Sequence, residues 1–286
     1  MAPFDRVVVV DWSANSTPKL GRDSIWVAEF DVAAGSIRSA NISTRSAAID
    51  LLVELSLAPG RCLVGVDFSL GFPAGFAAAL GLVGTPWSAT WELLAAEIED
   101  SDRNANNRFE VASSLNARVS PGAGPFWGCH PSRASEHLTT KKVGCAPLGE
   151  WRTVEALLRT RGRRPFSSWQ LLGAGAVGSQ SLLGVASMSK LLPRVSSTGR
   201  SIDVWPFTTG IAVPAADTVL AEVWPTLVDL PDTAADIWDS RVRDQVQVET
   251  LASYLGTADL AALFVPPVPT EARQIVECEE GWVLGA

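Results

Sequence analysis

The feature that most constrains this chain is a run of four valines, Val7–Val10, that ends in Asp11. β-Branched residues favour strands, and an unbroken apolar run is typical of a strand buried on both faces. The same arrangement recurs in CLVGVD, which ends in Asp67, and in TVLAE, which ends in Glu222. Three distant segments therefore predict buried strands that each end in a carboxylate.

The order of the predicted elements favours an α/β fold with a mixed sheet. Strands at 6–11, 24–31 and 36–44 are predicted to form an antiparallel meander, followed by a helix that Pro59 and Gly60 close and a strand at 62–67. Near the end we expect a strand at 218–225 and a helix at 236–255. The segments between these two parts predict helices at 85–100, 109–117, 150–162 and 179–192. We therefore expect a single domain over 1–286, with its core from 1–70 and 200–286 and a mostly helical insertion at about 71–200.

The strand-end acids predict a metal site. The carboxyl ends of parallel strands meet at one edge of a sheet, which places Asp11, Asp67 and Glu222 together. Like charges that close raise each other's pKa, so a cation is needed between them. Hard oxygen ligands suit Mg²⁺ or Mn²⁺. The alternative is that Asp11 and Asp67 each cap a turn.

A fourth acid belongs to the same prediction. On the expected helix at 236–255, residues 237, 241, 244, 248, 251 and 255 share one stripe, so Asp244 lies on the face that packs against the sheet. The alternative is an ion pair between Asp244 and Arg241 at i, i+3.

The net charge and the composition limit the classes of partner that this protein is expected to bind. The net charge of −8 disfavours extended, non-specific nucleic-acid binding, and the arginine cluster at 159–165 is typical of a solvated helix end. A small phosphorylated molecule or a structured nucleic-acid end remains the expected partner. The uncharged stretches at 68–91 and 166–189 are interrupted by Gly, Ser or Pro, so no membrane span is expected.

The N-terminus and the cysteines favour a cytoplasmic protein. The N-terminal MAPFDR carries an acid before a short apolar run, unlike a signal peptide. The four cysteines form no CxxC pair, which favours reduced thiols. The oligomeric state is left open.

Glycines at 173, 175 and 178 satisfy the G-x-G-x-x-G fingerprint of dinucleotide sites. That fingerprint requires a preceding strand, a following helix and a later acid. A helix is expected afterwards, but FSSWQLL is a poor strand. A nucleotide or dinucleotide binding protein that uses this loop is thus one alternative function, and a non-catalytic binding module is another. Candidate substrate-binding residues around the acids are Trp12, Ser13, Arg108, Trp127 and Gln180.

Several motifs carry a family resemblance. VVVVDWSA, VGVDFSLGFP, SSWQLLGAGAVGSQ, DVWPFTTG, AEVWPTL and EEGWVLG resemble a bacterial family of uncharacterised ribonuclease-H-like proteins, over nearly the whole chain. Some relatives in that family are labelled as acting in molybdopterin guanine dinucleotide synthesis. The order of meander, helix, strand, late strand and late helix is also similar to that of the wider ribonuclease-H-like superfamily.

The resemblance implies a metal-dependent phosphoryl-transfer enzyme of the nuclease or phosphohydrolase type. It places Asp11, Asp67 and Asp244 at metal-ligand positions and adds Glu222 to the catalytic acids. Nucleases of the superfamily often carry a second acid on the last helix, where this chain has Gln247 or Val248. That departure implies that one metal ion is held weakly.

Overall fold

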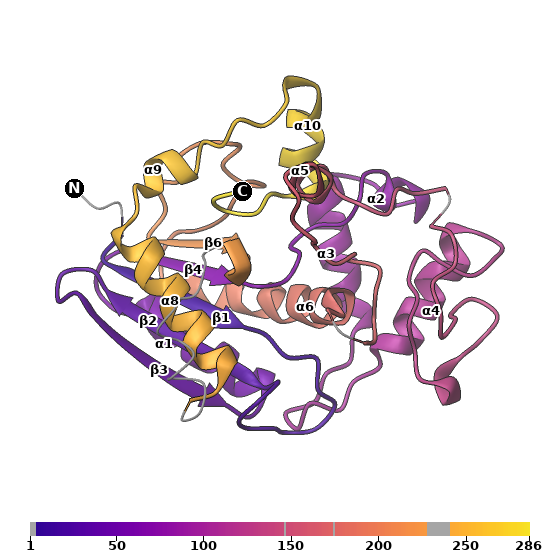
Figure 1. Ribbon diagram of the computed structural model, residues 1–286, viewed down its shortest axis with the longest axis horizontal. Coiled ribbons are helices and arrows are strands. Elements are labelled where there is room, and N and C mark those ends of the chain that lie inside the picture. Colours follow the sequence, from indigo (N-terminus) through magenta and orange to yellow (C-terminus); the bar gives the residue numbers. More distant parts are fainter. Residues whose placement is uncertain (1–3, 146, 174, 228–240) are drawn as a thin grey trace.

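The computed structural model describes residues 4–145, 147–173, 175–227 and 241–286. Within these ranges the chain forms a six-stranded mixed sheet with helices on both faces (Figure 1). The order across the sheet is β3-β2-β1-β4-β6-β5. The strands are β1 (Arg6–Asp11), β2 (Ile25–Asp31), β3 (Ser36–Ile42), β4 (Cys62–Val66), β5 (Ile202–Val204) and β6 (Thr218–Glu222).

The first three strands form the predicted antiparallel meander, and the remaining pairs are parallel. The mixed α/β sheet and the order of its long strands are thus confirmed, while the short edge strand β5 was not predicted. Strand β6 ends at Glu222, earlier than the predicted 225, because Pro225 begins a 3₁₀ turn. A proline there cannot donate to the next strand's ladder.

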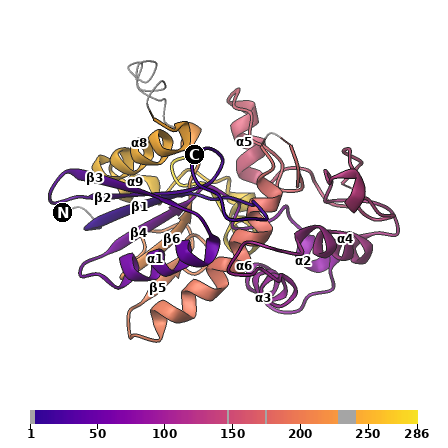
Figure 2. The same ribbon diagram turned by 90° about the horizontal axis from the view of Figure 1, so that it is seen from below.

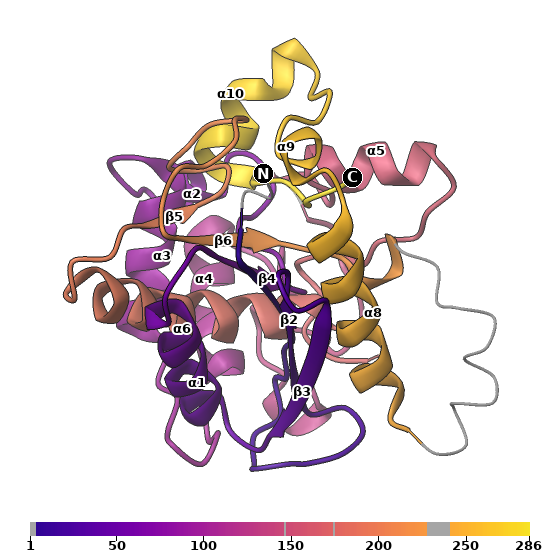
Figure 3. The same ribbon diagram turned by 90° about the vertical axis from the view of Figure 1, so that its left-hand side faces the viewer.

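Helices cover the two faces of the sheet. α1 (Arg45–Leu57) and α6 (Val177–Ser196) lie on one face, and α8 (Arg243–Thr257) lies on the other (Figures 2 and 3). The side chains of β1 alternate between these faces, with Val8 and Val10 in one apolar cluster and Val7 and Val9 in the other. Because both faces of β1 are covered by apolar clusters, all four positions from Val7 to Val10 are apolar. The helix predicted at 236–255 begins only at Arg243, because Val242 has an extended backbone; residues 236–240, with Ile237, lie outside the described residues.

The segment expected as an insertion carries α2 (Phe76–Ala79), α3 (Pro86–Glu97), α4 (Arg108–Val119) and α5 (Thr153–Thr160) before it reaches α6. α2, α3 and α4 lie beyond the carboxyl ends of the parallel strands (Figure 1). One apolar cluster runs from the sheet into this segment, and Phe72, Phe126 and Trp169 pack within it. The helical segment and the sheet therefore share a core.

The chain ends with two short helices, α9 (Leu260–Leu263) and α10 (Arg273–Ile275), and a π-helical turn at Val276–Glu280. Among the described residues, none of the helices has the length and apolar character that crossing a bilayer requires.

Candidate functional site

Three adjacent parallel strands bring their terminal acids to the same edge of the sheet. Val10 is in register with Val66, and Val66 with Glu222. The Asp67 N–H continues the ladder by donating to the carbonyl of Val10 at 3.3 Å. The predicted convergence of Asp11, Asp67 and Glu222 is therefore present in the structure.

Asp11 and Asp67 form a carboxyl pair. Their side chains share a hydrogen bond, and the Trp12 N–H donates to Asp67 Oδ1 at 2.8 Å. Within the described part of the chain, neither carboxyl group forms an ion pair with a Lys, Arg or His side chain. The pair has no cationic partner there.

This environment raises the pKa of both carboxyl groups. Burial raises the pKa of Asp67 to about 7, although the Trp12 N–H and Asp11 act in the opposite direction. Burial, followed by the charges of Asp67 and Asp244, raises the pKa of Asp11 well above its ordinary value. Two carboxyls in contact cannot both ionise without a counter-charge, so the pair retains a proton or binds a cation.

Asp244 lies beside the pair, in the first turn of α8, where a helix dipole favours a carboxylate. Its Oδ2 accepts a hydrogen bond of 2.7 Å from the Asp23 N–H. Its charge raises the pKa of both Asp11 and Asp67. The alternative of an Arg241–Asp244 ion pair is wrong, because Arg241, which precedes α8, pairs with Glu249 instead.

Glu222 is neutralised by a buried arginine. Arg152, which is 1% exposed, donates from Nη1 and Nη2 to the two carboxylate oxygens of Glu222 at 2.7 and 2.6 Å. The Leu70 N–H donates to the same carboxylate at 3.0 Å. Arg152 also pairs with Glu155 in the first turn of α5. Glu222 was predicted to be a catalytic acid, but in the structure Arg152 already compensates its negative charge.

The described residues contain no cluster of three or more His, Cys, Asp or Glu side chains arranged to hold a metal ion. The predicted set of Asp11, Asp67 and Asp244 is therefore not a closed three-ligand cage. Instead, two carboxyls touch, and a third is held nearby by a backbone N–H. This fits the way Mg²⁺ binds through one or two carboxylates and keeps its other positions for water and substrate phosphates.

Two cavities meet at Asp11, and Gly175 and Gln180 also line both of them. The first, of about 320 Å³, reaches Asp67 and has an apolar wall. The second, of about 440 Å³, is more polar and reaches Asp244. The apolar wall of the first cavity is formed by Leu158, Pro165, Phe166, Val177, Val223 and Trp224.

Four of the five predicted substrate-binding residues line the second cavity: Trp12, Ser13, Arg108 and Gln180. Trp12 contributes little surface, because its side chain is 1% exposed and packs on Phe68. The Gln180 amide is fixed by donating to the carbonyl of Trp12. Trp127 lines neither cavity; it lies in a bridge with Gln170, away from the acids.

The glycine loop lacks the strand that a dinucleotide fingerprint requires. The described segment before α6 pairs only as an isolated bridge, Trp127 with Gln170, and α6 follows directly. A Cβ at Gly178 would lie 2.4 Å from the Ser168 carbonyl oxygen, and a Cβ at Gly175 would meet the Phe166 ring at 2.2 Å. Close packing of helix and loop accounts for both glycines.

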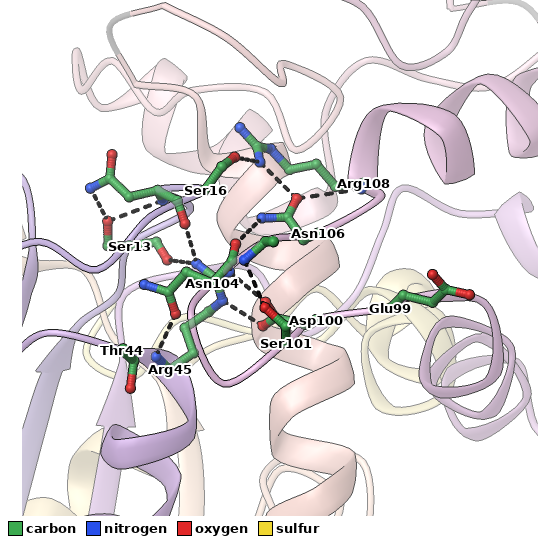
Figure 4. Close-up of polar contacts among 12 residues, drawn as sticks. Ser13, Ser16, Thr44, Arg45, Glu99, Asp100, Ser101, Asn104, Asn106 and Arg108 are labelled. Atoms are coloured by element: carbon green, nitrogen blue, oxygen red, sulfur yellow. Dashed lines mark hydrogen bonds and ion pairs between the residues drawn. The ribbon is translucent and has the colours of Figure 1, made fainter.

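A second buried arginine holds the loop after β1. Arg45, which is 1% exposed, binds both oxygens of Asp100 at 2.6 Å and donates to the carbonyls of Ser13 and Asn15 (Figure 4). Asn15 in turn donates to the carbonyl of Asp23 at 2.6 Å. These hydrogen bonds hold Ser13, Asn15 and Asp23, which line the second cavity, to one another and to Arg45.

Arg45, Arg152 and Asp23 were not predicted from the sequence to belong to the site. Each arginine stands at a helix end in a polar stretch, which is also where solvated arginines occur. Asp23 adds a further acidic charge that raises the pKa of Asp11. Its backbone has a positive φ of 53°, a conformation that sequence alone signals weakly for Asp.

Comparison with known proteins identifies no relative: no family model, curated protein or solved structure matches this chain. The assignment of a function therefore depends on the geometry of the site.

Proposed function

We propose that this protein is a divalent-metal-dependent phosphoryl-transfer enzyme of the nuclease or phosphohydrolase type. The observation that carries the proposal is the hydrogen-bonded pair of Asp11 and Asp67, which lacks a cationic partner among the described residues; Asp11 lines both cavities and Asp67 the first. A buried like-charge pair costs several kcal/mol unless a proton or a cation compensates it. A bound Mg²⁺ or Mn²⁺ relieves that cost.

A ribonuclease-H-like fold is part of the proposal. An antiparallel meander followed by parallel strands, with α8 across the meander, supports it. The acids at the ends of β1 and β4 and in the first turn of α8 support the same assignment, because they occupy one edge of the sheet.

In this proposal Asp11 and Asp67 bind the ion directly, and Asp244 adds negative charge next to it. When bound, the ion supplies an activated water and stabilises the charge on the leaving oxygen. Arg152 keeps Glu222 neutralised, so Glu222 orders the backbone at Leu70 and does not compete for the ion. The cavities around the pair suit a small phosphorylated molecule or a structured nucleic-acid end.

Two alternatives make different predictions. A dinucleotide-binding protein needs the glycine loop to follow a strand, which the described structure lacks. It predicts saturable quenching of tryptophan fluorescence by NADPH, lost in Gly175→Val. A non-catalytic binding module predicts no response to metal ions or to phosphate esters.

The test begins with protein stripped of metal by EDTA. We expect Mg²⁺ or Mn²⁺ to raise the melting temperature of the natural chain, and we expect this rise to vanish in Asp11→Asn and Asp67→Asn. Asp102→Asn, an exposed acid away from the site, is the matched control. Hydrolysis of p-nitrophenyl phosphate and its bis-ester should require the metal and both acids. A melting temperature that neither ion changes would overturn the proposal.

A further inference from the structure

Arg108 carries a buried positive charge that no described carboxylate neutralises. Its side chain is 8% exposed, lies in the first turn of α4 and lines the second cavity. Its hydrogen-bond acceptors are neutral: Nε donates to Ser179 Oγ at 2.9 Å, and Nη1 donates to Ser16 Oγ at 3.0 Å and Asn106 Oδ1 at 2.8 Å. The guanidinium also lies over the Phe109 ring, 4.3 Å from its centroid, but a buried cation without a carboxylate partner still costs several kcal/mol.

The neighbouring charges explain why Arg108 stays unpaired. The carboxylates whose charges act on Arg108 are Asp100 and Glu110. Asp100 is bound at both oxygens by Arg45 (Figure 4), and Glu110 pairs with Arg133. Burial, followed by the positive charge of Arg45, lowers the pKa of Arg108 to about 10. The guanidinium remains charged at neutral pH but lacks a counter-ion among the described residues.

The guanidinium is also held in one orientation with a free edge. Ser179 is fixed in turn, because its Oγ donates to the carbonyl of Leu171 at 2.6 Å. Three neutral acceptors thus occupy Nε and Nη1, while Nη2 makes no hydrogen bond to a described residue. A pre-oriented guanidinium with a free N–H edge is suited to the oxygens of a phosphate.

The backbone around the cavity contributes less. The N–H groups of Val177, Gly178 and Ser179, at the start of α6, already donate to carbonyl oxygens. The dipole of this 20-residue helix still favours an anion at its N-terminus. The side chain of Arg108 is therefore the principal donor for an anion in this cavity.

We propose that Arg108 binds a phosphate group of the substrate in the second cavity, next to the carboxyl pair. The inference rests on the proposed function for its substrate class: a phosphate ester whose anionic part lies toward Arg108 and whose apolar part lies against Phe166 and Trp224 in the first cavity. Asp11 lines both cavities, so such a molecule passes the carboxyl pair.

Inorganic phosphate, titrated in EDTA at constant ionic strength, tests the subsite without a metal ion. We expect saturable broadening of the ³¹P signal and a rise in melting temperature for the natural chain, with affinity at least tenfold weaker in Arg108→Gln. Arg103→Gln, which removes an exposed charge five positions earlier, should bind phosphate as the natural chain does. Equal affinity in Arg108→Gln, or no saturable binding by the natural chain, would overturn the inference.

Two further variants complete the design. If Arg108→Gln fails to fold, Arg108→Lys retains the charge but not the fork of donors, and phosphate affinity should fall at least threefold; unchanged affinity counts against the subsite. Asp11→Asn should lose stabilisation by Mn²⁺ and keep phosphate binding. Phosphate binding without any metal response would therefore refute the proposed function alone, whereas a metal response without phosphate binding would refute the subsite alone.

Discussion

Arg152 and Glu222 form a buried, two-pronged ion pair, with Nη1 and Nη2 of the arginine 2.7 and 2.6 Å from the two carboxylate oxygens. This contact divides the three strand-end acids into two groups. Glu222 receives its counter-charge from the protein, whereas Asp11 and Asp67 share a hydrogen bond with each other. Of the three strand-end acids, Asp11 and Asp67 are therefore the two that lack a positively charged partner among the described residues.

The pH dependence of stability should report the carboxyl pair. Folded Asp67 keeps its proton up to about pH 7, whereas unfolded Asp releases it near its ordinary value of 3.8. A raised pKa favours the folded state fully below pH 3.8 and progressively less as the pH rises to 7. Asp67→Asn should remove this loss and raise stability at pH 8 in EDTA by on the order of 1–2 kcal/mol.

Melting temperatures from pH 4 to 8, for the natural chain and the Asp67→Asn and Asp102→Asn variants, measure this effect. The side-chain amide introduced by Asp67→Asn still offers an oxygen to the Trp12 N–H, so the geometry is retained. A parallel pH profile for the natural chain and Asp67→Asn would contradict the raised pKa.

Breaking the Arg152–Glu222 pair should destabilise the fold without affecting the metal response. Glu222→Gln leaves a buried guanidinium with one carboxylate fewer, which costs about 3 kcal/mol. Glu97→Gln, which breaks the half-exposed pair with Arg118, should cost under about 1 kcal/mol. Urea titrations give both values. Loss of the Mn²⁺-induced shift in folded Glu222→Gln would show instead that Glu222 acts on the metal.

Substitution of Gly178, at the start of α6, should lower stability, because the helix packs closely against the loop before it. Alanine is the better helix former by about 1 kcal/mol, yet Gly178→Ala should lower stability by about 2 kcal/mol, because its Cβ would lie 2.4 Å from the Ser168 carbonyl oxygen. Gly122→Ala has open space around the new Cβ and should be nearly neutral. Chemical denaturation of both variants measures this difference. If Gly178 served ligand binding and not close packing, Gly178→Ala would leave stability unchanged.

Asp244 should strengthen metal binding without being essential to it. Asp244→Asn keeps an oxygen for the Asp23 N–H but removes a charge that acts on both Asp11 and Asp67. We expect the Mn²⁺ concentration at half-maximal stabilisation to rise roughly three- to tenfold, equivalent to about 1 kcal/mol. An unchanged midpoint would remove Asp244 from the site, and complete loss of the response would make it an obligatory ligand.

The local pattern was enough to predict the positions of the strand-end acids. Val7–Val10 and the apolar run before Asp67 are buried on both faces, and parallel strands align their carboxyl ends. The stripe that contains Asp244 was likewise visible as helical periodicity. The short strand β5 was missed, because three residues carry too little periodicity to stand out from a loop.

Which basic residue pairs with which acid could not be predicted from the local sequence pattern. Trp127 was chosen as a candidate from its loop composition, but the fold directs it away from both cavities. The alternative reading of Asp244 paired it with Arg241 at i, i+3, yet Arg241 pairs with Glu249 and Asp244 accepts from the backbone N–H of Asp23. Competition between partners of this kind depends on what the rest of the chain places nearby.

The sequence by itself determined where the buried strands lie and that acids end them, since β-branched runs and alternating burial are local properties. Only the tertiary structure decided which acids are neutralised. Arg152 is 70 positions from Glu222, and Arg45 is 55 positions from Asp100. Coulombic pairing acts through space, so folding assigned both arginines to other acids and left Asp11 and Asp67 facing each other.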